Sequence, residues 1–292
     1  MSIIGLGDYA AEFDETSPVL NKLITDSIRT SNQWLVGLGA AVASFHYYRM
    51  GRLVLPLALF LGLGSVLGST LVPWLTAGEV SLRNYLGTFG LFVLFMGAYL
   101  FYETTPRGQA RKRGAREAAL AFEASIKAGR SANEAEAGGQ GVQITAIGPK
   151  KVTFTFFGVA FSFNPVIPVL SGFVVAGLAS FLGVGGGFLL VPFLISVAGL
   201  PMYLVAGTAS LAVLIGMVTS IFSFMVIKGT PVFWPLVGVE MIGVFLGSLI
   251  GLRLSRHIPD IWLQRLFVVL ALYVGTRFFT KGFLGTSLVP PF

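Results

Sequence analysis

Repeated apolar runs constrain this chain more than any other feature of its sequence. Hydrophobic helices are predicted at residues 33–48, 53–75, 84–102, 166–182, 203–227, 231–252 and 261–280. Most of these runs hold about 20 residues, the length that an α-helix needs to cross a hydrocarbon core of about 30 Å. Only 11% of the 292 residues are charged, whereas a soluble domain carries about a quarter. We therefore predict an all-α integral membrane protein with about seven transmembrane helices.

Basic residues predict which loops face the cytoplasm. They gather at Arg49 and Arg52, within 103–152 (nine of the 20 Lys and Arg), and at Arg253, Arg256 and Arg265. Because short cytoplasmic loops are enriched in Lys and Arg, these three regions are predicted to face the cytoplasm, while the acidic segment 1–28 and the loop 76–83 face outside. This arrangement predicts a multi-pass protein of the cytoplasmic (inner) cell membrane.

The basic region is also predicted to be a soluble insertion. Residues 107–128 are rich in Ala, Arg and Glu and predict a helix near the anionic membrane surface, and 129–141 reads as a flexible linker. The alternating runs VQITAI and VTFTFF flank GPKK, which predicts a hairpin. The basic cluster serves either membrane topology alone or a regulatory or lipid-contact role.

Short matches relate the two halves of the chain. GSVLGS at 64–69 matches GVFLGS at 243–248, and Thr30-Ser31-Asn32 matches Thr208-Ala209-Ser210. The charge pattern makes 33–48 run inward and 203–227 run outward, so the halves are predicted to be inverted repeats. Secondary transporters use such repeats to build a site near the membrane midplane. Chance similarity between apolar segments is the alternative.

Two ladders of glycines recur at every fourth residue. The first holds Gly64 and Gly68, and the second holds Gly243, Gly247 and Gly251. Glycines at this spacing share one helix face and let a neighbouring helix approach closely. We expect a packing role, and the second ladder is also a candidate homodimer contact.

Several functional classes are disfavoured by composition. The chain has no Cys, and His46 and His257 lie far apart, so no metal site is expected. Neither paired carboxylates nor a nucleophile–base set occur at helical spacing, so we expect neither an enzyme nor a cofactor. The pI near 9.8 is explained by the cytoplasmic loops, and nucleic-acid binding is not expected.

The segment GVGGG at 183–187 carries the clearest chemical signal. Four glycines in five residues cannot form a stable helical turn. Unwound backbone at membrane depth is tolerated only where protein buries it or a wet cavity borders it. The free N–H groups near Phe188 and Leu189, where the helix restarts, would form an anion-binding end without a lysine. A simple interhelical loop is the alternative.

The apolar stretch 186–198 is too short to span alone, so it is either a re-entrant half-helix or a second crossing.

At this point the residues resemble a known family. GLASFLGVGGGFLLVPFLISVAGLPMYLVAGTAS at 177–210 resembles the second-half signature of the TauE/SafE sulfite exporter (TSUP) family, and 29–69 resembles part of its first half. The resemblance implies an anion permease of the bacterial cytoplasmic membrane that moves sulfite or organosulfonates. The family carries a glycine motif in both halves, but residues 1–28 hold neither that motif nor a first span.

The resemblance also implies a substrate site. Its predicted residues are Ser31, Asn32, Gln33, Gly185, Gly186, Gly187, Thr208 and Ser210. For Thr208 and Ser210, simple bonding to the helix backbone is the alternative.

Glu240 is the one acid well inside a predicted span, about 13 Å from the start of its helix. Ionisable groups at such depth are rare and point to function. We expect proton coupling, with Thr219 or Ser220 as a partner, and the alternative is a protonated Glu in one interhelical hydrogen bond.

The predicted organisation has five parts: an extracytoplasmic segment 1–28, a first and incomplete membrane repeat 29–102, a cytoplasmic insertion 103–164, a second repeat 165–281 and a tail 282–292. The predicted function is secondary transport of small sulfur-containing anions across the bilayer by alternating access, in the export direction. The alternative is a non-transporting anion sensor or assembly partner that acts through the insertion.

Overall fold

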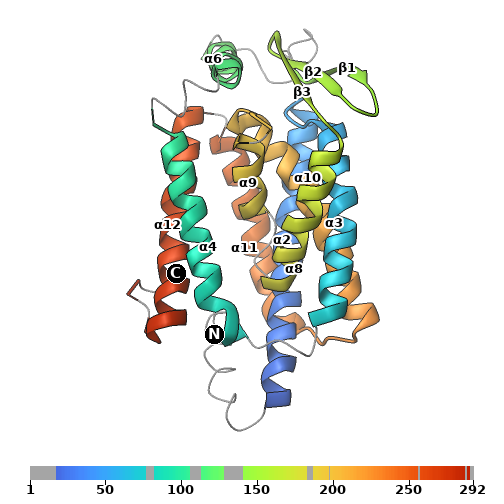
Figure 1. The fold of residues 1–292 in the computed structure, drawn as a ribbon, viewed down its shortest axis with the longest axis vertical. Coiled ribbons are helices and arrows are strands. Elements are labelled where there is room, and N and C mark those ends of the chain that lie inside the picture. Colours follow the sequence, from blue (N-terminus) through green and yellow to red (C-terminus); the bar gives the residue numbers. More distant parts are fainter. Residues whose placement is uncertain are drawn as a thin grey trace.

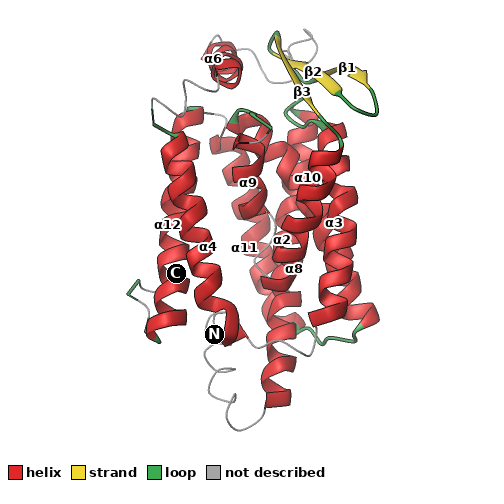
Figure 2. Cartoon of the chain, viewed as in Figure 1, coloured by secondary structure: helices red, strands yellow, loops and turns green. Residues whose placement is uncertain are grey.

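The computed structural model is a bundle of long helices with a small sheet at one end (Figures 1 and 2). It describes residues 18–76, 82–105, 113–127, 141–182, 187–196, 198–255, 257–286 and 288–289. The helices are α2 (Pro18–Arg49), α3 (Leu55–Thr76), α4 (Leu82–Glu103), α6 (Arg113–Lys127), α8 (Val166–Leu182), α9 (Gly187–Ser196), α10 (Met202–Phe222) with a π-helical turn η1 (Ser223–Ile227), α11 (Trp234–Ser255) and α12 (Asp260–Leu284). The strands are β1 (Gln143–Ile147), β2 (Val152–Phe156) and β3 (Val159–Phe163).

The helices confirm a multi-pass, mainly α-helical membrane protein. Five candidate spans in the described chain are long and apolar enough to cross a bilayer: Leu55–Thr76, Leu86–Glu103, Met202–Ile227, Trp234–Leu254 and Asp260–Leu284. Many of their large apolar side chains point outward, as they must where the surroundings are lipid. Each of these spans corresponds to a run predicted from the sequence.

The insertion and the basic loops lie together at one end of the bundle. The α2–α3 loop, α6, the sheet and the α11–α12 loop all lie at this end (Figure 1). We call it the insertion end and the opposite one the far end. Helix α2 runs toward the insertion end, and α10 runs away from it (Figure 1). The two helices are therefore antiparallel.

The helices on either side of the glycine break run in opposite directions. Helix α8 enters from the insertion end and α9 returns toward that end (Figure 1). Residues 183–186 lie outside the described residues, and α9, at 10 residues, is about 15 Å long. Its length is about half of what a crossing of the hydrocarbon core needs.

Helix α2 begins earlier than the apolar run predicts. It starts at Pro18, whereas the run starts at residue 33. The added turns carry Asp26 and Arg29, whose side chains are buried and paired with each other. Pairing lets the helix stay inside the bundle despite its charges.

The insertion contains the predicted hairpin and one more strand. Strand β2 pairs antiparallel with β1 and with β3, in the order β1-β2-β3. The third strand was not predicted, because its tight turn places Phe157 and Gly158 at positive φ (48° and 78°) without a strong turn sequence. The N–H of Val142 donates to the carbonyl of Gly51 at 3.1 Å, which ties the sheet to the α2–α3 loop. Of the predicted linker 129–141, residues 129–140 lie outside the described residues.

The two glycine ladders have different surroundings. A Cβ atom at Gly64 would meet the carbonyl oxygen of Val169, and one at Gly68 would meet that of Phe173, so the first ladder seats α8 directly against α3. In the second ladder, Cβ atoms would meet nothing within 4 Å among the described residues. The packing role is therefore observed for the first ladder, while the second leaves an open face on α11.

This contrast gives a matched pair of variants. Gly68→Leu should destabilise the fold by about 1–3 kcal/mol or more, because the side chain collides with α8 backbone. Gly247→Leu, at the corresponding position of the second ladder, should change the stability of the monomer by less than about 0.5 kcal/mol. Thermal unfolding of the purified proteins in detergent measures both, and equal destabilisation by the two changes would contradict the observed packing.

Candidate functional site

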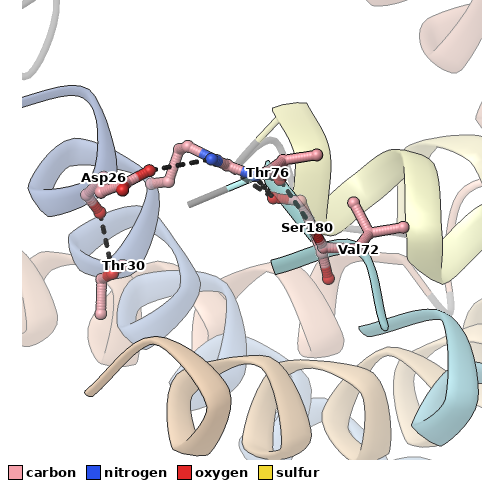
Figure 3. A network of polar contacts seen from close by, with 6 residues as sticks. Asp26, Thr30, Val72, Thr76 and Ser180 are labelled. Carbon is pink, nitrogen blue, oxygen red and sulfur yellow. Dashed lines mark hydrogen bonds and ion pairs between the residues drawn. The ribbon is translucent and has the colours of Figure 1, made fainter. Parts of the chain in front are cut away.

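A buried arginine joins three helices beside the glycine break. Arg29 of α2 donates from Nη1 to Oδ1 of Asp26 at 2.9 Å. It also donates from Nε and Nη2 to the carbonyl oxygen of Ser180 on α8, at 3.2 and 2.8 Å, and from Nη2 to Oγ1 of Thr76 on α3 at 3.2 Å. Figure 3 shows Asp26 on one side of this network and Thr76 and Ser180 on the other. We call these four residues the Arg29 network.

Aromatic rings enclose the guanidinium. Its central carbon lies 4.7 Å from the ring centre of Phe224 in η1 and 5.9 Å from that of Phe181. Arg29 is only 1% exposed. A buried cation is tolerated when an opposite charge and hydrogen bonds compensate it, and Asp26 supplies that charge. The network is thus a cation that is already neutralised, held in a water-poor environment.

The network adjoins the point where the membrane helix is interrupted. Ser180 lies in the last turn of α8, which ends at Leu182, and α9 begins at Gly187. The last carbonyls of a helix attract cations and the first N–H groups attract anions. Arg29 therefore binds the negative end of α8 close to the chain segment that leads to the positive end of α9. Gly185 and Gly186 of the predicted site lie outside the described residues, and Gly187 is the first residue of α9.

Buried polar groups without partners occur near the same place. Gln33, one turn beyond Arg29 on α2, is fully buried, and neither its Nε2 nor its Oε1 forms a hydrogen bond within the described chain. The hydroxyls of Ser180 and Ser220 are also buried without a described partner. Just past Gln33, a Cβ atom at Gly37 would lie 3.5 Å from Met217, so this face of α2 packs on α10 near Ser220. Buried groups of this kind mark places where a polar ligand or ordered water fits.

The remaining predicted site residues of α2 differ in their surroundings. Ser31 is buried, but its hydroxyl donates to the carbonyl of Ser27 at 2.8 Å within the same helix. Asn32 is half-buried. Gln33 is therefore the member of this trio with unused hydrogen-bonding capacity.

The α10 members lie elsewhere. Oγ1 of Thr208 accepts from the N–H of Val54 in the α2–α3 loop at 3.2 Å, and the hydroxyl of Ser210 bonds back to its own helix. A Cβ atom at Gly207 would lie 3.0 Å from Cβ of Tyr47, so Thr208 is level with the insertion end of α2. Tyr47 is 14 residues from Gln33, or about 21 Å along the helix. The predicted residues thus fall into two groups, one in each half of the bundle.

Glu240 is separate from both groups. It is half-buried on α11, and its Oε2 makes no hydrogen bond within the described chain. Helix α11 packs mainly against α2, whereas the expected partners, Thr219 and Ser220, belong to α10. The hydroxyl of Thr219 donates to Ile215 of its own helix at 2.8 Å.

Sequence reasoning missed Arg29 and Asp26. The boundary predicted between residues 28 and 29 separated the two, because hydropathy counts each charge as a cost. The available signal was the spacing of Asp26, Arg29 and Gln33, which places a carboxylate, a guanidinium and an amide on one face of a helix.

Removing the negative partner of the buried pair should destabilise the protein. Asp26→Asn leaves the guanidinium buried with reduced compensation, which is expected to lower the free energy of unfolding by about 3 kcal/mol. The double variant Asp26→Asn/Arg29→Met should recover part of that loss. Thermal unfolding in detergent tests both, and a change below about 0.5 kcal/mol in the single variant would mean that the pair behaves as a surface ion pair.

Comparison with known proteins supplies the family. The family model described as Sulfite exporter TauE/SafE matches residues 16–278, which include α2, the glycine break and most of α12. Neither the comparison with curated proteins nor the one with solved structures finds a match. The matched region covers most of the chain. The chain therefore belongs to the TauE/SafE sulfite exporter family.

Proposed function

We propose that this protein is a secondary transporter that exports small sulfur-containing anions, such as sulfite or organosulfonates, by alternating access. Membership of the family supports an anion exporter of the membrane. The observation that carries the proposal is the Arg29 network, a buried and neutralised guanidinium next to an interrupted membrane helix and the unpartnered amide of Gln33. The guanidinium, the nearby start of α9 and the amide of Gln33 all present N–H groups, which suit a negatively charged ligand.

The pairing of Arg29 with Asp26 suggests how an anion can bind and still leave. A planar guanidinium offers two parallel N–H groups, which suit two oxygens of a sulfite or sulfonate group. A lone buried cation would hold a doubly charged anion too tightly for release. When Asp26 occupies Arg29 in the empty state, an arriving anion exchanges with the carboxylate. The net affinity is then a difference between two similar interactions.

The arrangement of helices supports the proposed inverted repeat. Helices α2 and α10 begin the two matched segments, pack against each other and run in opposite directions (Figure 1). We also propose that the open ladder of α11 (Gly243, Gly247 and Gly251) forms the contact with a second copy of the chain. Small residues at this spacing permit close helix pairing.

The proposal is tested by sulfite flux in proteoliposomes. Arg29→Lys keeps the positive charge but loses the two-pronged donor, so flux should fall at least about tenfold. The control is Lys150→Gln, which also alters a basic residue but lies in the exposed turn between β1 and β2. Full flux in Arg29→Lys would exclude the Arg29 network as the anion site. Sulfite binding without flux in the unaltered protein would instead favour a sensor that acts through the insertion.

Glu240 is proposed to couple transport to protons. Because Glu240→Gln mimics the protonated acid, it should abolish flux driven by a pH gradient and spare equilibrium sulfite binding. Flux at several pH gradients, together with calorimetric binding, measures the two effects. Unchanged coupling would mean that Glu240 has a structural role on α11.

A further inference from the structure

A second buried arginine lies at the insertion end. Arg52, in the loop between α2 and α3, is 1% exposed. Its Nε donates to the carbonyl oxygen of Tyr203 at 3.3 Å. Its Nη1 and Nη2 form no hydrogen bond anywhere in the described residues. The four N–H groups of Nη1 and Nη2 are therefore buried without an acceptor among the described residues.

Three aromatic rings surround this guanidinium. The ring centres of Tyr47, Tyr203 and Phe122 lie 4.9, 5.0 and 5.1 Å from its central carbon. Aromatic faces stabilise the positive charge, but they do not accept the N–H groups in the guanidinium plane. Burial lowers the pKa of Arg52, and the nearby Tyr47, Tyr203 and Asp260 oppose the shift. Arg52 stays charged because an arginine is not deprotonated at physiological pH.

The acid that attracts Arg52 electrostatically forms no hydrogen bond with these donors. The carboxylate of Asp260, at the start of α12, attracts Arg52 electrostatically. Its Oδ2 accepts from the side chain of Gln264 at 2.7 Å, and no ion pair joins it to Arg52 in the described chain. A buried charged donor without an acceptor is costly, so the arrangement calls for an acceptor from outside the chain. A small oxyanion supplies the several acceptor oxygens that Nη1 and Nη2 lack.

Helix α6 of the insertion covers this site. Phe122 packs against Tyr203 with ring centres 4.5 Å apart and the ring planes tilted by 47°, and both rings face Arg52. The next residue, Glu123, accepts at Oε1 from the hydroxyl of Tyr203 at 3.2 Å and from the N–H of Asp260 at 3.0 Å. One carboxylate of the insertion thereby holds the starts of α10 and α12 together over the buried guanidinium.

The two buried arginines lie at opposite ends of the α2–α10 pair. Arg29 packs on Phe224 just after α10 ends, whereas Arg52 packs on Tyr203 where α10 begins. From Arg29 to the end of α2 at Arg49 there are 20 residues, or about 30 Å, which is the thickness of a hydrocarbon core. The two arginines are thus separated along the bundle by about the thickness of a hydrocarbon core.

We propose that Arg52 is a second anion site, at the insertion end, which binds a free small oxyanion of the sulfite or sulfonate class, and that α6 is the cap that closes it. The choice of anion rests on the proposed function, whereas binding at Arg52 does not require transport. When α6 lifts, an anion enters this site from the insertion end, and from there it would move on toward Arg29. The insertion then controls access from its own side of the membrane.

Binding to the full-length protein in nanodiscs of phosphatidylcholine tests the site. Sodium sulfite is titrated calorimetrically into the unaltered protein, Arg52→Gln and Arg49→Gln. The last variant is a matched control, because Arg49 is an exposed arginine three residues away. Arg52→Gln should abolish one class of binding site or weaken it at least tenfold, while Arg49→Gln behaves as the unaltered protein. Unaltered binding in Arg52→Gln would overturn the proposal.

A second variant tests the cap even if Arg52→Gln does not fold. Glu123→Ala removes the contacts to Tyr203 and Asp260 and should speed sulfite association at least threefold in stopped-flow measurements. An unchanged association rate would contradict a cap. Repeating the titration with phosphatidylglycerol in the nanodiscs separates a free anion from a lipid headgroup. Unchanged sulfite affinity supports the free anion, and a tenfold loss would assign the site to the lipid instead.

Sulfite flux distinguishes this proposal from the proposed function. If the unaltered protein binds sulfite at Arg52 but shows no flux, transport fails and the site stands. If flux is present, Arg52→Gln should raise the KM for sulfite offered at the insertion end at least tenfold and leave the KM at the far end unchanged. Equal KM values at both ends in that variant would overturn the Arg52 site while leaving transport intact.

Discussion

The contact between Arg29 and the last turn of α8 is the interaction on which the rest of the structure depends. Helix α8 can end inside the bundle because of this contact. In a longer helix, the carbonyl of Ser180 would accept a backbone hydrogen bond, and here the guanidinium donates to it instead. Asp26 makes the cation tolerable in that place, and Thr76 brings in the end of α3. One charge pair thereby holds helices α2, α3 and α8 together near the point where α8 ends.

Two glycines of α3 also make the contact between Arg29 and α8 possible. Gly64 and Gly68 let α8 approach α3 at backbone distance, which places Ser180 within reach of α2. Larger residues there would move α8 away and leave the guanidinium without its acceptors. Packing and electrostatics thus depend on each other, which explains why small residues and a buried ion pair occur together in this half of the protein.

The membrane fold could be predicted from the sequence, because long apolar runs and the distribution of Arg and Lys are strong physical constraints. The five candidate spans and the hairpin followed directly. The bounds of α9 did not, because the apolar stretch 186–198 fits either a re-entrant half-helix or a second crossing. The start of α2 could not be predicted from hydropathy either, because hydropathy does not show that Asp26 and Arg29 neutralise each other.

The site was only partly predictable for a related reason. Sequence matches identified Gln33 and Thr208 but carry no information about height in the bundle, and the structure places them about 21 Å apart. The burial of the two arginines could not be inferred from the residues next to them in the sequence. For Arg52, the charge of a cytoplasmic loop was an equally good explanation. Their burial became visible only when helices distant in sequence were brought together.

The central claim is that the anion binds Arg29 in exchange for Asp26. A cryo-electron microscopy structure of the protein in nanodiscs with saturating sulfite tests it most directly. The account predicts density for the anion with its oxygens about 2.7–2.9 Å from the guanidinium nitrogens of Arg29, and a rotated Asp26. Sulfite density elsewhere, with the Arg29–Asp26 pair intact, would contradict it.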